Sequence, residues 1–236
     1  TDGSINTTYT SVNTTAGFSI CKWSGTGSAG TIGHGLGAVP KMIICKNTDT
    51  TVNWIVYHNK LDASSPQNKY IELNANTALQ DYTMWNDTAP TNSYFSVGSD
   101  IATNKSGSPM IAYCFAEKTG YSKFGSYEGN GNADGPFVYT GFKPAFVIIK
   151  NAAASEHWRM YDNKRDSFNL MYKCLFPNLN SNENTTNNGS EEIDFFSNGF
   201  KIRSSSGQLN GTNQSHIYMC FGQSIVGSNG VTAKAR

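Results

Sequence analysis

The sequence predicts an all-β protein built from two tandem, homologous β-sandwich units. Three observations support this prediction: an internal repeat, short apolar segments of strand length, and a composition rich in turn-forming residues. The chain of 236 residues contains 26 Asn and 23 Gly, while only 15% of its residues are charged. No stretch of about eleven residues shows a clear period of 3.6, so helices are not expected to build the core.

The repeat becomes visible when the chain is compared with itself at a shift of 104 residues. Gly37–Asn47 returns as Gly141–Asn151, and Trp54–Asp62 returns as Trp158–Asp166. Later landmarks match at shifts of 105 and 106, and landmarks that keep one order with so little drift indicate duplication. The expected division is an extended N-terminal arm or connector at 1–16, unit 1 at 17–118, unit 2 at 121–224 and a C-terminal tail at 225–236.

Each unit contains several segments with the pattern of short strands. Apolar and polar or smaller residues alternate at Phe200–Ile202 and at Ile217–Phe221, which is the period-2 pattern of a half-buried strand. Met42–Cys45 and Phe146–Ile149 are continuous apolar runs, so central strands are expected there. Asn-Gly pairs, which favour turns with positive φ, stand at 130–131, 188–189, 198–199, 210–211 and 229–230.

Residues at matching positions of the two units are expected to share one environment. A sandwich buries alternate residues of each strand, so a slip of one residue would move a whole set into water. The pairs expected in the two cores are Trp54/Trp158, Ile44/Ile148, Phe95/Phe200 and Phe115/Phe221.

Composition and spacing exclude several classes of function. A net charge of +1 gives no electrostatic reason to bind nucleic acid or an anionic membrane surface. No run approaches the roughly 18 consecutive apolar residues of a membrane helix, so no membrane insertion is expected. The five cysteines lack a CxxC spacing and stand mostly in apolar runs, so we expect free, buried thiols and no zinc site.

The sequence assigns no catalytic residue, no metal ligand and no cofactor. Glu191, Glu192 and Asp194 lie close in the chain, but a glycosidase needs two carboxylates held across a cleft, which spacing cannot show. Asp62 and Asp166 are duplicated, and either bind calcium in an oxygen-rich loop or accept hydrogen bonds from their own turns. The turn interpretation is favoured, because such side chains commonly close on nearby backbone.

Tyr82 and Trp85 are the candidate ligand-binding residues. They stand in a stretch rich in Asn, Asp and Thr, and Trp85 has no counterpart in unit 2. Either the two rings are exposed and stack on a sugar or on another subunit, or they cover one end of the sandwich.

A set of linked motifs suggests a family. The motifs are Gly17–Ile20, Gly33–Pro40, Ala112–Glu117, Phe124–Gly131, Gly135–Phe142, Ser197–Arg203 and the closing Ala233–Arg236. Together they resemble a family of uncharacterised repeat domains in virion proteins of marine tailed bacteriophages, labelled tail-fibre or structural proteins. The resemblance implies a lectin-like or jelly-roll-like sandwich and a place in the virion, but it brings no catalytic motif.

The expected function is therefore that of a non-enzymatic phage virion structural protein. It would serve as a tail-fibre or appendage part or a surface adhesion module, assembled in the host bacterial cytoplasm and exposed on the particle. Two alternatives stay open, a capsid-decorating protein and a carbohydrate-binding module of a polysaccharide-active protein. The expected partners are other virion proteins, further copies of the chain and a host surface glycan, without nucleic acid.

Overall fold

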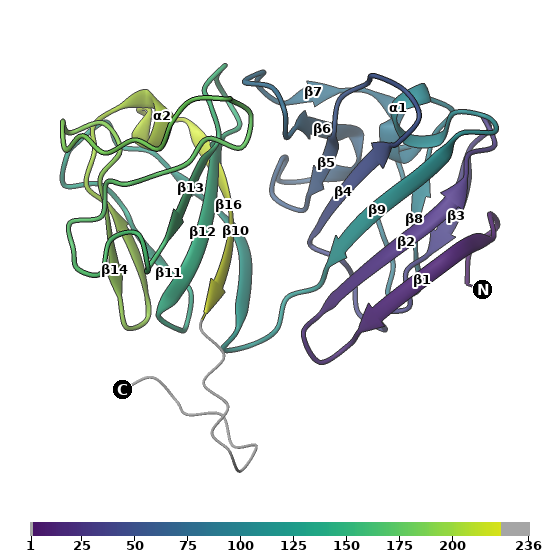
Figure 1. Cartoon of the computed structure of the whole chain (residues 1–236), viewed down its shortest axis with the longest axis horizontal. Helices are drawn as coiled ribbons and strands as arrows, with labels where there is room; N and C mark the ends of the chain where they lie inside the picture. Colours follow the sequence, from purple (N-terminus) through teal and green to yellow (C-terminus); the bar gives the residue numbers. More distant parts are fainter. Residues whose placement is uncertain (1, 223–236) are drawn as a thin grey trace, which may run out of the picture. The chain divides into compact units, whose positions relative to one another are not determined.

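Strands dominate the structure, and the all-β prediction is confirmed. A computed structural model describes residues 2–222 (Figure 1), so the expected tail at 225–236 lies outside the described residues. The described residues divide into two compact units: unit 1 holds Asp2–Ala75 together with Leu79–Glu117, and unit 2 holds Asn76–Ala78 and Lys118–Gly222. None of the helices in the described part is long and apolar enough to cross a membrane.

Unit 1 contains a seven-stranded and a two-stranded antiparallel sheet (Figure 1). The larger sheet has the order β1 (Thr7–Asn13), β2 (Phe18–Ser24), β9 (Pro109–Phe115), β4 (Met42–Asn47), β5 (Ile55–His58), β6 (Lys69–Glu72) and β7 (Gln80–Asp81). The smaller sheet pairs β3 (Gly30–Gly33) with β8 (Tyr94–Val97). Short helical turns complete the unit: η1 (Pro66–Asn68), η2 (Thr83–Trp85) and α1 (Ile101–Asn104).

Residues 1–16, expected as an arm or connector, contain strand β1. This strand pairs with β2 from Thr7 opposite Trp23 to Asn13 opposite Phe18. Ile5 forms a further bridge to Ile32 and is buried in the core of unit 1. Unit 1 therefore begins before residue 17, because the segment supplies an edge strand.

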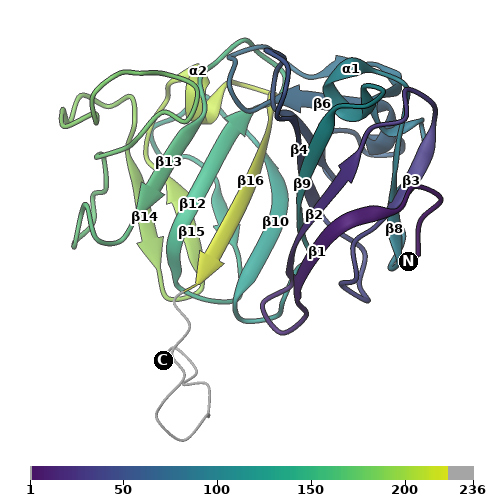
Figure 2. The same cartoon turned by 45° about the vertical axis from the view of Figure 1, so that its right-hand side comes forward.

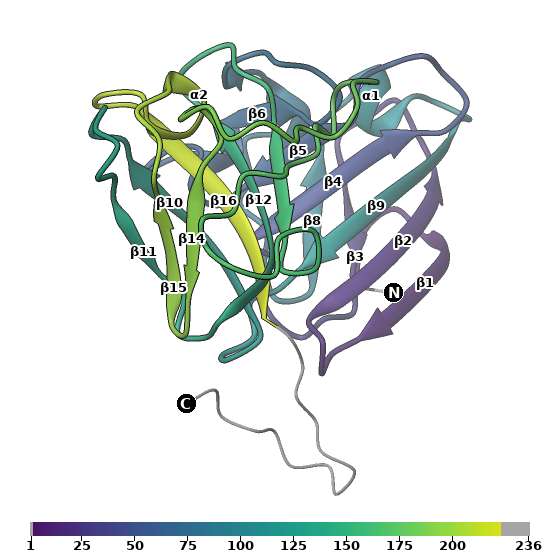
Figure 3. The ribbon, with the colours of Figure 1, turned by 60° about the vertical axis from the view of Figure 1, so that its left-hand side comes forward.

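Unit 2 contains a four-stranded and a three-stranded antiparallel sheet (Figures 2 and 3). The larger has the order β10 (Ser122–Glu128), β16 (Ser215–Gly222), β12 (Pro144–Asn151) and β13 (Arg159–Asp162). The smaller has the order β11 (Phe137–Tyr139), β15 (Gly199–Ile202) and β14 (Ile193–Phe196), and the turn α2 (Gly207–Asn210) precedes β16.

Each unit has one hydrophobic core, to which both of its sheets contribute. In unit 1, Trp23 and Ile43 of the larger sheet join Phe95 and Val97 of the smaller one. In unit 2, side chains of β12 and β16 join those of β14 and β15 in the same way. All five cysteines are buried and none forms a disulfide, as expected of small apolar side chains.

Strand pairing recurs between the units in the same register. Met42 stands opposite Phe115 in unit 1, and Phe146 stands opposite Phe221 in unit 2, at shifts of 104 and 106 residues. The predicted central strands are confirmed, because β4 lies between β9 and β5 and β12 lies between β16 and β13.

A buried asparagine holds the same place in both units. Asn104 ends α1 and Asn210 ends α2, and both side chains are fully buried. Each side-chain amide donates to three oxygens at 2.7–3.1 Å: for Asn104 those of Thr26, Ser28 and Gly98, and for Asn210 those of Asn130, Asn132 and Ser204. The acceptors match at shifts of 104 and 106, so the repeat extends to a hydrogen-bond network.

The expected core pairs are only partly correct. Ile44/Ile148 and Phe95/Phe200 are buried, but Trp54 is half-buried while Trp158 is buried, and Phe115 and Phe221 are both half-buried. Neither tryptophan belongs to a core cluster, because strand alternation gives Ile55 the core side of its sheet and Trp54 the other side. Trp54 instead stacks on Tyr113, with ring centroids 6.4 Å apart. The sequence pattern showed that these positions repeat but not which face they take.

The prediction for the Asn-Gly pairs is also only partly correct. Gly131 and Gly189 have positive φ, of 68° and 82°. Gly199 and Gly211 do not, and Gly199 is the first residue of β15, paired with Phe196. The pair 229–230 lies outside the described residues.

Candidate functional site

The two candidate ligand-binding residues of the sequence do not form a platform. Tyr82 is 52% exposed, but Trp85 is only 2% exposed and belongs to the core of unit 1. The turn η2 directs the Trp85 ring inward, where it packs edge-on against Tyr57 with centroids 6.0 Å apart. Trp85 therefore cannot stack on a ligand, and it fills the core instead.

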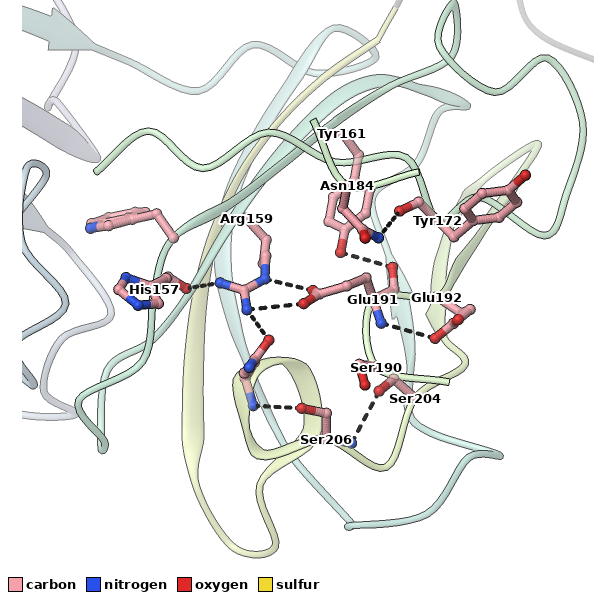
Figure 4. Close-up of polar contacts among 12 residues, drawn as sticks. His157, Arg159, Tyr161, Tyr172, Asn184, Ser190, Glu191, Glu192, Ser204 and Ser206 are labelled. Atoms are coloured by element: carbon pink, nitrogen blue, oxygen red, sulfur yellow. Dashed lines mark hydrogen bonds and ion pairs between the residues drawn. The ribbon is translucent and has the colours of Figure 1, made fainter. Parts of the chain in front are cut away.

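Two of the three carboxylates considered for hydrolysis, those of Glu191 and Glu192, are part of a buried polar cluster in unit 2 (Figure 4), whereas Asp194 pairs with Arg203 elsewhere. Arg159 on β13 donates to Glu191 from Nε to Oε2 at 2.5 Å and from Nη2 to Oε1 at 3.0 Å. The same guanidinium donates to Gln208 and, at 2.9 Å, to the carbonyl of His157. Arg159 also lies over the ring of Phe176, 4.7 Å from its centroid.

Both glutamates are committed to partners within the protein. Burial raises the pKa of Glu191, and the charge of Arg159 opposes that rise. Glu192 is 1% exposed and accepts hydrogen bonds from the backbone N–H groups of Gly189 at 2.6 Å and Glu191 at 2.9 Å. A glycosidase needs one carboxyl group to give a proton and another to face the sugar. In this cluster Glu191 pairs with Arg159, and Glu192 accepts from backbone N–H groups of the protein itself.

The cluster has no equivalent at the matching position of unit 1. Arg159 matches Ile55 at a shift of 104, and Ile55 is a fully buried core residue. The presence of Arg159 at the position that Ile55 occupies in unit 1 is a sequence signal from which a buried charged group could have been inferred. It could not identify Glu191 as the partner, because the segment before Glu191 has no clear match in unit 1.

The duplicated aspartates accept hydrogen bonds from their own loops. Asp62 Oδ1 accepts from the backbone N–H groups of Ser64 and Ser65 at 2.9 and 2.8 Å, which lowers its pKa. Asp166 Oδ2 accepts from the backbone N–H groups of Tyr172 and Lys173 at 2.9 and 2.7 Å. The turn interpretation is confirmed for Asp62, whereas Asp166 accepts from residues six and seven positions further along the chain. Residues 2–222 contain no group of three His, Cys, Asp or Glu side chains placed to hold a metal ion.

Figure 3 shows the β11-β15-β14 sheet of unit 2 as a ribbon. The outer face of this sheet carries exposed aromatic side chains. Phe137 is 46%, Tyr139 is 65% and Phe196 is 39% exposed. They point outward because Val138 and Phe195, their neighbours in the strands, point into the core. We call Phe137, Tyr139 and Phe196 the aromatic face.

A glycine lies at the centre of the aromatic face. Gly199 on β15 stands opposite Tyr139 on one side and Phe196 on the other. A Cβ atom at this position would lie 2.9 Å from the Phe137 ring and 2.2 Å from the carbonyl oxygen of Val138. Because glycine leaves this space empty, the Phe137 ring reaches Phe196 in an edge-to-face contact with centroids 5.8 Å apart.

An open polar depression of about 700 Å³ lies at the β11-β15-β14 sheet. Its lining comprises Ala133, Asp134, Asn169, Leu170, Asp194 and Arg203.

Ion pairs connect the charged groups of this depression. Asp134 binds Lys201 at 2.8 Å and Arg203 at 3.4 Å, and Arg203 Nε binds Asp194 at 3.2 Å. Lys201 lowers the pKa of Asp134. The side chain of Asn169 pairs with both the N–H and the carbonyl of Phe195, at 2.9 and 3.0 Å, which fixes one wall. This region therefore offers both hydrogen-bond donors and acceptors, and its two positive charges balance its two negative charges.

Unit 1 presents a different surface at its smaller sheet. Thr31 pairs with Ser96, and Gly33 pairs with the half-buried Tyr94, at the places that Phe137, Tyr139 and their partners occupy in unit 2. A sheet of this kind therefore forms without an aromatic face. Our sequence reasoning missed these residues, although Phe137 and Tyr139 flank Val138 with the period of a strand and have no counterparts in unit 1.

Comparison with known proteins gives one match. A family model described as a domain of unknown function (DUF7483) matches residues 1–224. Neither a curated protein nor a solved structure matches the chain. The description of the family names no activity, so it adds no chemistry to the residues above.

Proposed function

Given that the chain belongs to the DUF7483 family, we propose that it is a non-enzymatic structural protein of a bacteriophage virion. Its role there is that of a tail-fibre or appendage part or a surface adhesion module, exposed on the particle. The linked motifs that resemble virion repeat domains, among them Gly33–Pro40, Ala112–Glu117 and Ser197–Arg203, support the location. Its partners are other virion proteins and further copies of the chain.

The proposal includes the architecture of two tandem, homologous β-sandwich units of the lectin or jelly-roll type. The strand order β2-β9-β4-β5 in unit 1 parallels β10-β16-β12-β13 in unit 2. The registers match at shifts of 104 and 106, and Asn104 and Asn210 accept and donate equivalent hydrogen bonds. A slip of one residue would reverse the faces of a strand, so a shared register over several strands supports common descent.

A binding role is supported above all by the aromatic face. Apolar groups grouped on the surface of a soluble protein usually mark a contact site, and the same sheet in unit 1 does without them. The carboxylates Glu191 and Glu192 are buried and hydrogen-bonded within the protein, which favours binding over hydrolysis. This observation also favours the second candidate, a carbohydrate-binding module of a polysaccharide-active protein.

The test is to locate the chain on purified phage particles. Antibodies raised against the chain, visualised by gold labelling in negative stain, should decorate the tail or its fibres. Label confined to the head surface would contradict the tail-fibre role and favour the capsid-decorating alternative. Particles that carry no label, although the antibody recognises the folded chain in solution, would refute the virion proposal.

A further inference from the structure

We infer that the aromatic face and the adjoining polar depression of unit 2 form a binding site for a neutral glycan. The inference deepens the proposed adhesion role and rests on it for its biological meaning. The site consists of Phe137, Tyr139 and Phe196 as stacking groups, with Asp194 and Arg203 beside them as hydrogen-bonding groups.

The geometry of the sheet places the stacking and hydrogen-bonding groups on one continuous surface. Phe137 faces Lys201 across the β11-β15 ladder, and Lys201 faces Asp194 across the β15-β14 ladder. Tyr139, Gly199 and Phe196 form the next row on the same face, roughly 7 Å further along the strands. The two outer strands lie roughly 10 Å apart, because β15 stands between them. The surface is thus larger than one sugar ring and suits a short oligosaccharide segment.

The chemistry of the surface fits sugars. The C–H face of a pyranose is apolar and flat, and it packs on an exposed aromatic ring, while hydroxyl groups at its edge need both donors and acceptors. Tyr139, the most exposed of the three rings, also offers a phenolic hydroxyl. Asp194 supplies acceptors, and Arg203 supplies donors, at the edge of the aromatic row.

The balance of charges around the aromatic face favours a neutral glycan over an anionic one. Asp134 and Asp194 carry two negative charges, Lys201 and Arg203 carry two positive ones, and all four take part in ion pairs with one another. A polyanion such as a sulfated or uronic-acid glycan, or a nucleic acid, gains little from a surface of zero net charge. The balanced set therefore favours a neutral ligand.

The size of the surface argues against a protein partner at this position. Three aromatic side chains that are 39–65% exposed offer about 300 Å² of surface. A stable protein interface buries about 800 Å² on each partner. The aromatic face is therefore too small to hold a second copy by itself, whereas it covers a substantial part of an oligosaccharide.

Affinity electrophoresis of the purified full chain tests the inference. The gels contain neutral polysaccharides (laminarin, starch, galactomannan or hydroxyethyl cellulose) or anionic ones (alginate or dextran sulfate). At least one neutral polysaccharide should retard the chain, and Tyr139→Ala should weaken that binding about tenfold or more. The matched control is Tyr82→Ala, which removes a similarly exposed tyrosine from unit 1 and should leave the retardation unchanged. Unfolding curves of both variants should match the parent, because both rings are exposed.

Three outcomes would overturn the inference. The parent is retarded by none of the neutral polysaccharides; Tyr139→Ala is retarded as strongly as the parent; or only the anionic polysaccharides retard the chain. A fourth outcome also overturns it, namely concentration-dependent self-association in sedimentation that Tyr139→Ala abolishes, because the face would then be an interface between copies. None of these outcomes depends on particle labelling, so the glycan site and the virion location fail separately.

Discussion

Replacing Arg159 by isoleucine tests the buried ion pair most directly, because Ile55 occupies the matching position of unit 1. The Arg159 side chain is 2% exposed and the Glu191 side chain 9% exposed, and two hydrogen bonds of 2.5 and 3.0 Å join them. Arg159→Ile leaves the Glu191 carboxylate buried without its partner, which costs about 3–5 kcal/mol of unfolding free energy. Urea unfolding followed by tryptophan emission measures this, since Trp158 adjoins the substituted residue.

A double variant shows how much of the lost stability comes from leaving Glu191 buried without Arg159, and how much from removing the ion pair itself. Arg159→Ile/Glu191→Leu removes both charges and should regain most of the lost stability, less the hydrogen bonds that Arg159 donates to Gln208 and to the His157 carbonyl. The matched control is Arg165→Ile, because Arg165 also pairs with a glutamate, Glu183, at 2.8 Å, but both side chains are about one-third exposed. That control should cost at most about 1 kcal/mol.

The loss of unfolding free energy in Arg159→Ile should be smaller at low pH than at neutral pH. Burial raises the pKa of Glu191, so between its unfolded and folded pKa values the folded state binds more protons than the unfolded state. The contribution of Glu191 to stability is therefore greatest below the unfolded pKa and is lost as pH rises through the folded pKa. Removing Arg159 raises the folded pKa further, so the variant should lose less stability at about pH 5 than at about pH 7. An equal loss at both pH values, with the double variant no better than the single one, would refute a buried, charged pair.

Three further predictions concern the two cores. Asn210→Ala in unit 2 and Asn104→Ala in unit 1 should each cost about 2–3 kcal/mol in urea unfolding, because each removes a network of hydrogen bonds and leaves a buried carbonyl unpaired, that of Ser204 or of Gly98. A loss in one unit alone would contradict the equivalence of the networks. Trp85→Ala should cost about 3–5 kcal/mol, and Trp54→Ala, at a half-buried position, about 1–2 kcal/mol, so the reverse ranking in thermal unfolding would contradict the burial described. Burial raises the pKa of the Cys45 thiol, and an alkylating thiol reagent should label none of the five buried cysteines until urea unfolds the chain, as counted by intact mass.

The sequence repeat made much of the fold predictable, because it shows the pattern of several strands twice. Met42–Cys45 was correctly placed as a central strand from its apolar run and its copy at Phe146–Ile149. Trp54 was assigned to the wrong face, because the continuous apolar run Trp54–Tyr57 conceals the alternation on which face assignment depends. Strand β1 was missed, since Thr7–Asn13 is polar and its residues are mostly exposed at a sheet edge.

The candidate site was less predictable than the fold for a physical reason. Trp85 was selected because it stood among polar residues without a counterpart, yet the turn η2 directs it into the core. Phe137 and Phe196 come from strands far apart in the chain, and only the pairing of both strands with β15 brings their rings together. Sequence spacing contains no information about such a pairing until the register is known.

The differences between the units indicate where function resides. Equivalent positions such as Asn104 and Asn210 keep their hydrogen bonds in both units, so they serve the fold that the units share. Phe137 and Tyr139 occur on the smaller sheet of unit 2, while unit 1 forms its own small sheet with Thr31 and Gly33 at those places. Exposed aromatic rings add little to the stability of a sheet whose other face already packs on a core, and their surface costs solubility. Phe137, Tyr139 and Phe196 are side chains that the pairing of the sheet does not require, and they are the ones on which the proposed glycan site depends.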